Sequence, residues 1–208
     1  MAQIMTPSKT TTDGQIDKAV ANYRTLLEKH SKEFSAEAVQ AVLGQSEFAG
    51  EQFAVFRRRV EAVSNLITVP VVVVNRDRSP QEALAATGFA QYTDREVVKN
   101  MPKAPADMAE IVFFKPDLSG RNGYISDDDL EHEYELRGLT PADPISVAAV
   151  NEADPDFADR AHHGTHWKDA DDKWNFAAFD RWLGKRRVLV NRSDDAWDDC
   201  WWFAGVRK

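Results

Sequence analysis

Apolar residues recur every three or four positions along the first third of the chain. This period predicts amphipathic helices, whose apolar stripes are residues 16, 20, 23, 27 and 34, then 39, 42 and 43, then 53, 56, 60, 63 and 67. Ser35 is a typical N-cap for the second helix, and Gly44 is a typical stop. The third helix begins near Ser46. Residues up to 67 therefore predict a helical hairpin or a three-helix unit.

The pattern then alternates between strands and short helices. Residues 69–74 are continuous and β-branched, which favours a buried strand with Pro70 at its start or on an edge. Ser79-Pro80-Gln81-Glu82 is a capping box for a helix that ends at Gly88, and Thr93-Asp94-Arg95-Glu96 is a second one. The next expected strand is residues 111–114.

Two further helices and two strand pairs are expected after residue 120. Ser126 predicts a helix that ends at Gly138, and residues 140–144 begin a short helix through Val150. Residues 166–168 and 174–179 predict a hairpin. Residues 188–190 and 201–206 predict a second pair, joined by an acidic loop at residues 193–199.

These elements predict an α+β fold, with an N-terminal helical unit packed on a mixed domain whose C-terminal sheet is mainly antiparallel and Trp-rich. The expected boundaries are a disordered lead-in at 1–14, the helical unit at 15–67 and the α+β domain at 68–208. A single continuous domain from residue 15 is the alternative.

Charge and tryptophan separate the two halves of the chain. Residues 1–104 hold 13 basic and 12 acidic side chains, whereas residues 105–208 hold 13 basic and 22 acidic ones and all six tryptophans. The net charge of −8 disfavours nucleic acid as a partner. No apolar run is long enough to span a membrane, and the start lacks the apolar core of a signal peptide. Together with the single Cys200, these features favour a cytoplasmic protein without disulfides.

Three segments resemble an uncharacterised family of bacterial hypothetical proteins: residues 81–88 (QEALAATG), 133–139 (EYELRGL) and 201–207 (WWFAGVR). The resemblance covers most of the chain from about Leu26 onward. It implies a bacterial, intracellular protein. It implies no activity, ligand or catalytic residue.

Histidines gather at one place, which gives the strongest catalytic hypothesis. His162, His163 and His166 are three of the five histidines in the chain, and Asp169, Asp156 and Asp159 are near in sequence. Imidazole and carboxylate groups can hold zinc or another divalent ion. The opposing interpretation is a polar loop with surface histidines, which Gly164 favours. The His-Glu-x-x-His pattern of zinc proteases is absent.

The remaining candidates each have a simpler interpretation. Asp127-Asp128-Asp129, with Glu131 and Glu133, could hold a cation, but acidic side chains also stabilise the first turn after an N-cap. Cys200 fits a small buried thiol better than a nucleophile. The basic clusters at 57–59 and 185–187 fit a solvated helix face and a charged strand edge better than phosphate contacts.

Aromatic residues are the most informative candidates. Nine large aromatic side chains lie within residues 167–203, and six of them are tryptophans: Trp167, Trp174, Trp182, Trp197, Trp201 and Trp202. Two adjacent tryptophans in one strand point to opposite faces, so at least one requires a second packing layer, an interface or a groove. We therefore expect a non-enzymatic binding or accessory protein, whose C-terminal aromatic and acidic surface takes a partner protein or a small ligand. The alternative is a metal-dependent hydrolase, and a divalent metal is the one cofactor it would need.

Overall fold

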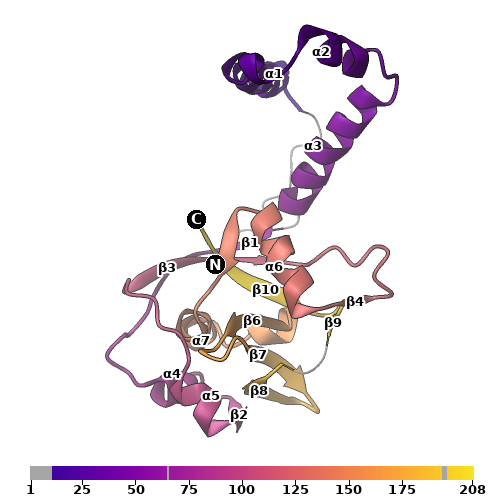
Figure 1. Ribbon diagram of the computed structural model, residues 1–208. Coiled ribbons are helices and arrows are strands. Elements are labelled where there is room, and N and C mark those ends of the chain that lie inside the picture. The colour runs from indigo at the N-terminus through magenta and orange to yellow at the C-terminus, as the bar shows by residue number, and fades with distance from the viewer. Residues whose placement is uncertain (1–10, 65, 194–195) are drawn as a thin grey trace. The chain divides into compact units, whose positions relative to one another are not determined.

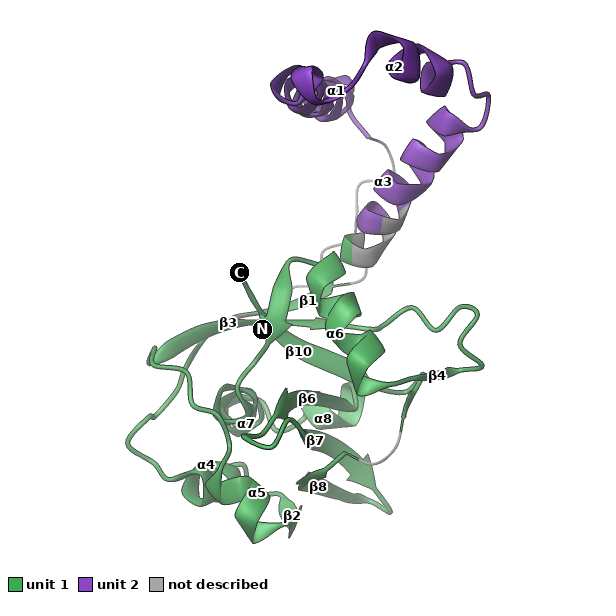
Figure 2. Ribbon diagram, in the orientation of Figure 1, with its two compact units in different colours: residues 1–5, 62–208 green, residues 6–61 purple. Residues whose placement is uncertain are grey.

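The computed structural model describes residues 11–64, 66–193 and 196–208, and they form an α+β protein with Trp-rich C-terminal strands. Residues 1–10 of the expected lead-in lie outside the described residues. The chain divides into two compact units between residues 61 and 62 (Figure 2). The expected boundaries at 14 and 67, and the packing of the helical unit on the mixed domain, stay predictions.

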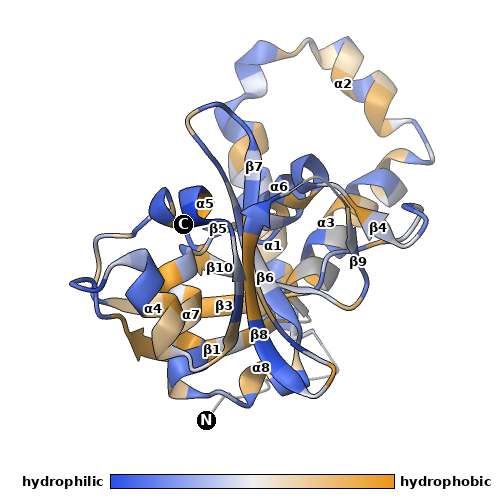
Figure 3. Cartoon of the chain, turned by 90° about the horizontal axis from the view of Figure 1, so that it is seen from below, coloured by the Kyte–Doolittle hydropathy of each residue, from blue (hydrophilic) through white to orange (hydrophobic). Residues whose placement is uncertain are grey.

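The first unit is helical, as its apolar period predicts. It contains α1 (Asp13–Lys29), the 3-10 turn η1 (Ser31–Glu33), α2 (Ala36–Leu43) and the first turns of α3 (Phe48–Ser64). Thr12 and Gln15 form a capping box at the start of α1, and Ser35 caps α2 as expected. Figure 3 shows hydrophobic and hydrophilic residues side by side on α2.

The second unit is built on an eight-stranded mixed sheet (Figure 1). The strands are β1 (Leu66–Val73), β2 (Ala90–Thr93), β3 (Met108–Phe114), β5 (Leu139–Pro141), β6 (His163–Lys168), β7 (Trp174–Trp182), β8 (Lys185–Arg192) and β10 (Trp202–Arg207). Their order is β1-β3-β10-β6-β7-β8-β2, with β5 also paired to β10. Among the strands that the structure describes, only β10 with β6 and β2 with β8 are parallel pairs, so the sheet is mainly antiparallel, as predicted.

Helices cover the two faces of this sheet unequally. The first face packs on α4 (Pro80–Ala86), α5 (Arg95–Lys99), α7 (Pro144–Ala153) and α8 (Phe157–Arg160). In Figure 3 hydrophobic residues gather where α4 and α7 lie beside β1, β3 and β10. The second face packs on α6 (Asp127–Leu136) and on the short pair β4 (Tyr124–Ile125) and β9 (Trp197–Asp198). The second face carries the candidate site.

Local capping chemistry places the helices of this unit. Ser79 and Glu82 form the predicted capping box of α4, and Ser126 caps α6 through the backbone N–H of Asp129. Asp94 rather than Thr93 caps α5. The last predicted helix begins later than expected, because Asp143 is the N-cap of α7.

The second predicted strand pair is wrong. β8 pairs with β7 and β2, whereas β10 pairs with β3, β5 and β6. The reason is a two-residue turn between β7 and β8. Leu183 and Gly184 both have positive φ, 47° and 78°, which suits the tight hairpin turn that matches strand twist. β8 therefore pairs with its neighbour in sequence and is not available to β10.

Candidate functional site

Two of the three clustered histidines, His163 and His166, lie on a strand and not in the expected loop, and His162 immediately precedes this strand. His163 and His166 are three residues apart on β6, so their side chains point to opposite faces of the sheet. His163 packs with Phe113, Phe157 and Phe179 on the first face. The predicted metal ligands are therefore divided by the sheet itself.

The contacts of His163 are those of a core residue. Its Nδ1–H donates to the carbonyl of Ala161 at 2.7 Å, and its Nε2 accepts from the Asn151 amide at 2.9 Å. Burial lowers the pKa of His163 to about 4. The ring is neutral near pH 7, and both of its nitrogens have partners within the protein.

The other predicted metal ligands lie apart as well. The His162 ring lies 6.0 Å from that of Trp201, and Asp169 accepts backbone N–H groups in the turn between β6 and β7. Across residues 11–64, 66–193 and 196–208, no three His, Cys, Asp or Glu side chains are grouped so as to hold a metal ion.

His166 instead lies at the centre of a charged cluster on the second face. Its Nδ1 lies 2.8 Å from Asp127 Oδ1, and its Nε2 lies 2.9 Å from Glu131 Oε1. The Nε2 contact has ion-pair distance without hydrogen-bond alignment. We refer to His166, Asp127, Glu131, Trp174 and Ser193 as the His166 cluster.

Two further donors complete the contacts of Asp127. Trp197 Nε1–H donates to Oδ1 at 2.9 Å, and the Ser193 hydroxyl donates to Oδ2. Burial alone would raise the pKa of Asp127, but the hydrogen bonds from His166, Ser193 and Trp197 outweigh it, and the pKa is lowered. Asp127 is therefore a nearly buried carboxylate that keeps its charge.

The surroundings of His166 favour its charged form. Burial disfavours the charge, but the hydrogen bond to Asp127, the close contact with Glu131 and the charges of both carboxylates outweigh this effect and raise the pKa of His166. Its ring stacks on Trp174 at 4.5 Å and 8°, and Tyr134 stacks at 5.5 Å and 23°. A cation over the face of an aromatic ring is attracted by its quadrupole. Charge and stacking together fix the ring between β7 and α6.

A cleft of about 500 Å³ opens beside this cluster. Its aromatic wall is formed by Phe176 and Trp197, whose rings meet edge to face at 5.2 Å. Its other lining residues are polar or small: Asp94, Asn191, Arg192, Ser193 and Ala196. Because the Ser193 hydroxyl also binds Asp127, this residue joins the cleft to the His166 cluster. We refer to it as the Ser193 cleft.

The six predicted tryptophans separate into three groups. Trp174, Trp197 and Trp201 lie on the second face, where Trp174 stacks on His166 and Trp197 contacts Trp201. Trp167 and Trp202 pack against the core of the first face, so adjacent Trp201 and Trp202 point in opposite directions, as alternation predicts. Trp182 lies at the end of β7 and is 57% exposed. The single predicted surface therefore does not include all six.

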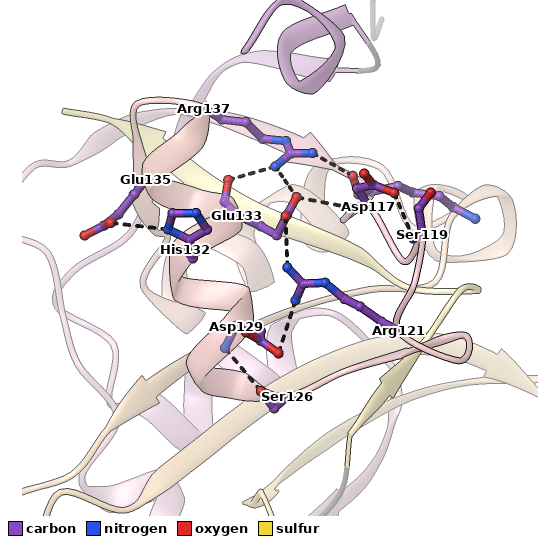
Figure 4. A network of polar contacts seen from close by, with 10 residues as sticks. Asp117, Ser119, Arg121, Ser126, Asp129, His132, Glu133, Glu135 and Arg137 are labelled. Atoms are coloured by element: carbon purple, nitrogen blue, oxygen red, sulfur yellow. Dashed lines mark hydrogen bonds and ion pairs between the residues drawn. The ribbon is translucent and has the colours of Figure 1, made fainter. Parts of the chain in front are cut away.

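A second polar network holds the other end of α6 (Figure 4). The buried Glu133 carboxylate lies 2.7 Å from Arg137 Nη1 and 3.6 Å from Arg121, and it accepts the Asp117 N–H. Arg121 also pairs with Asp129 at 3.2 Å. This network fixes the loop before β4 to α6. The acidic run is thus more than a solvated first turn, because Asp127 and Glu133 are both buried.

The structure also changes the interpretation of Cys200 and of the basic residues 185–187. Cys200 is exposed and lies in a turn, not buried in a strand. Partial burial of its sulfur, with the nearby Asp198 carboxylate, raises the pKa of the thiol to about 12, which makes it a poor nucleophile. In the cluster at 185–187, Arg186 pairs with Asp156 and Asp159, and Arg187 pairs with Asp180.

Comparisons with protein-family models, with curated proteins and with solved structures give no match to the chain. The expected bacterial origin stays a prediction. In the part of the chain that the structure describes, no helix has both the length and the apolar character that crossing a bilayer requires. Function is therefore inferred from the site alone.

Sequence reasoning singled out His166, Trp174 and Trp197. It named Asp127 and Glu131 only as members of an acidic run, and it did not single out Ser193. Asp127 is one of three consecutive aspartates, and only the packing of α6 on β6 selects the one that turns inward. Ser193 belongs to the loop that was expected to join β8 to β10. No local signal distinguishes either residue.

Proposed function

We propose that the protein is a non-enzymatic binding protein and that the Ser193 cleft takes a small, neutral, hydroxyl-rich ligand such as a monosaccharide. One observation carries the proposal: a cleft of about 500 Å³ whose lining combines two aromatic residues, Phe176 and Trp197, with polar side chains. Small-molecule sites combine an aromatic or apolar wall with a few placed polar groups in this way.

Charge in the cleft favours a neutral ligand. Asp94 and Arg192 contribute one charge of each sign, and Asn191 and Ser193 contribute an amide and a hydroxyl. Amide, hydroxyl and charged groups all form hydrogen bonds with ligand hydroxyls. The ring face of a sugar can contact Phe176 or Trp197 while its hydroxyls reach the polar side. The buried His166 cluster supports this arrangement by fixing Ser193 and Trp197 through Asp127.

The test uses the full chain and glucose, galactose, mannose and N-acetylglucosamine as probes. Saturation-transfer NMR detects the bound sugar, and titration gives its affinity. We expect saturable binding of at least one probe. Asn191→Ala and Arg192→Ala should each weaken it about tenfold, since each removes a polar contact. Trp182→Phe, at the end of β7, is the matched control and should leave binding unchanged.

Three results would contradict the proposal. None of the four sugars binds, or binding survives both cleft substitutions, or a bound sugar is converted to a product. The metal-dependent hydrolase is tested in parallel by metal analysis of the purified protein. A stoichiometric divalent ion that is lost in both His163→Ala and His166→Ala would replace the binding proposal with the hydrolase.

A further inference from the structure

Within the helical unit, an apolar stripe runs along α1 and is not buried by the other described residues of that unit. On α1, Ile16, Val20, Tyr23 and Leu27 are 51%, 63%, 44% and 50% exposed, and α1 has no buried residue. Scattered exposed apolar residues are ordinary on a protein surface, but a continuous stripe of this kind marks an interaction site.

Helix stability requires that the stripe be covered. An isolated helix of about 15 residues is marginal in water, because propensity alone barely offsets the cost of nucleation. α1 has 17 residues, and its capping box at Thr12 adds about 1 kcal/mol. Most helical stability in proteins comes from packing of the apolar face.

The spacing of the stripe is that of a coiled coil. Steps of four, three and four residues separate Ile16, Val20, Tyr23 and Leu27, which gives the 3.5-residue average of the core positions a and d. Asp17 and Arg24 occupy the flanking e positions on one side. Ala19 and Leu26 occupy the g positions on the other side, where Leu26 is 55% exposed.

We propose that α1 pairs antiparallel with α1 of a second copy of this chain. In an antiparallel pair, e positions meet e positions and g positions meet g positions. Asp17 then lies beside the second copy's Arg24, and Arg24 beside its Asp17, so two ion pairs form across one side. Leu26 packs on the second copy's Ala19 and widens the apolar seam. A parallel pair places e beside g and brings Arg24 against alanine, which forms no ion pair.

The apolar area of α1 suits a weak dimer. Five α1 side chains are about half exposed: Ile16, Val20, Tyr23, Leu26 and Leu27. At about 80 Å² each, these five side chains present roughly 400 Å² per copy, against about 800 Å² per partner in a standard interface. The dimer should therefore dissociate at micromolar concentrations.

Sedimentation equilibrium of the full chain, from about 1 µM to about 100 µM, tests the pairing. The wild type should convert from monomer to dimer over this range. Asp17→Arg and Arg24→Asp should each weaken the dimer about tenfold, because each sets two pairs of like charges side by side. The double variant restores both ion pairs and should return the dissociation constant to within about twofold of the wild type.

Asp17 and Arg24 are seven residues apart on one helix and do not contact each other within it, so rescue by the double variant reports contact between copies. Val20→Glu should abolish the dimer, and circular dichroism at high and low concentration should show α1 gaining helix on pairing. A wild type that stays monomeric throughout overturns the proposal. So do single charge variants with unchanged affinity, or a double variant that is as weak as the singles.

Discussion

Replacement of Asp127 by asparagine is the sharpest test of the His166 cluster. The substitution keeps the shape of the side chain and removes its charge. In the wild type the carboxylate accepts hydrogen bonds from His166, Ser193 and Trp197, and it balances the charge of an imidazolium that is 1% exposed. In Asp127→Asn the amide oxygen can still accept from His166 and Trp197, but the amide nitrogen replaces Oδ2 beside the Ser193 hydroxyl. His166 then keeps only Glu131 as an anionic partner.

Asp127→Asn removes one partner of a buried ion pair, and the expected loss in the free energy of unfolding follows from this. Removal of one partner of such a pair costs about 3–5 kcal/mol, because the remaining charge stays buried without compensation. In Asp127→Asn, Glu131 still partly compensates the charge on His166, so we expect the free energy of unfolding to fall by about 3 kcal/mol. We expect a similar decrease for His166→Leu. The double variant Asp127→Asn/His166→Leu should cost about 4 kcal/mol, which corresponds to a coupling energy of about 2 kcal/mol.

Urea unfolding followed by tryptophan fluorescence measures these losses, since all six tryptophans lie in the affected unit. Asp129→Asn is the matched control: it lies in the same first turn, and its exposed carboxylate pairs with Arg121. This control should lose less than about 1 kcal/mol. Additive losses in the double variant, or equal losses in Asp127→Asn and Asp129→Asn, would refute the assignment.

The pH dependence gives an independent check of the same pair. The pKa of His166 is raised on folding, so its contribution is complete below the ordinary value of 6.5 and is lost as pH rises through the folded pKa. The pKa of Asp127 is lowered, so its contribution is complete above the ordinary value of 3.8 and is lost as pH falls through the folded pKa. The stability difference between wild type and Asp127→Asn should therefore be largest between pH 4 and 6.5. A difference that grows steadily above pH 7 would contradict the charged form of the cluster.

Three further outcomes follow from single residues. Gly164→Ala should destabilise the sheet by about 1–3 kcal/mol in urea unfolding, because its Cβ would lie 2.9 Å from the Ala177 carbonyl oxygen; an unchanged midpoint would show that β6 and β7 can move apart. Ser126→Ala should cost about 1 kcal/mol in the same assay through loss of the α6 cap, and a Ser126→Asp variant should recover it. Cys200, with a pKa of about 12, should react with iodoacetamide at pH 8 about a hundredfold more slowly than a free thiol, and reaction at the free-thiol rate would contradict the raised pKa.

The sequence predicts elements best where their cause is local. The caps at Ser79 and Ser126 are read from four consecutive residues, and both helices begin where those residues place them. The predicted pairing of β8 was wrong because the tight turn at Leu183 and Gly184 was not recognised. The partners of β10 lie far from it in sequence, and no local pattern identifies them. The short strand β2 was missed because Ala90–Thr93 has no clear alternation and pairs with β8 across a long separation.

Local signals and long-range packing also contribute differently to the candidate site. Trp201, just before β10, and Trp202, its first residue, pack in different clusters, as the local period of an extended chain predicts. The choice of Asp127 among three aspartates, and its meeting with Ser193 and His166, depends on the packing of α6 against the sheet. Residues that are distant in sequence form this cluster, and no single segment carries its pattern.

The central position of β10 has a consequence for folding kinetics. It lies between β3 and β6, and Phe203 pairs with Phe114 on one side and with Gly164 on the other. Strands β6, β7 and β8 can pair early because they are neighbours in sequence, whereas β1 and β3 pair across the segment that holds α4, β2 and α5. The two groups remain separate sheets until β10 joins them. Long-range closure of this kind slows folding, so the rate-limiting barrier should lie at the docking of residues 202–207. Folding intermediates in which β10 has not yet docked would expose the inner edges of β3 and β6. These are the strand edges most prone to intermolecular pairing.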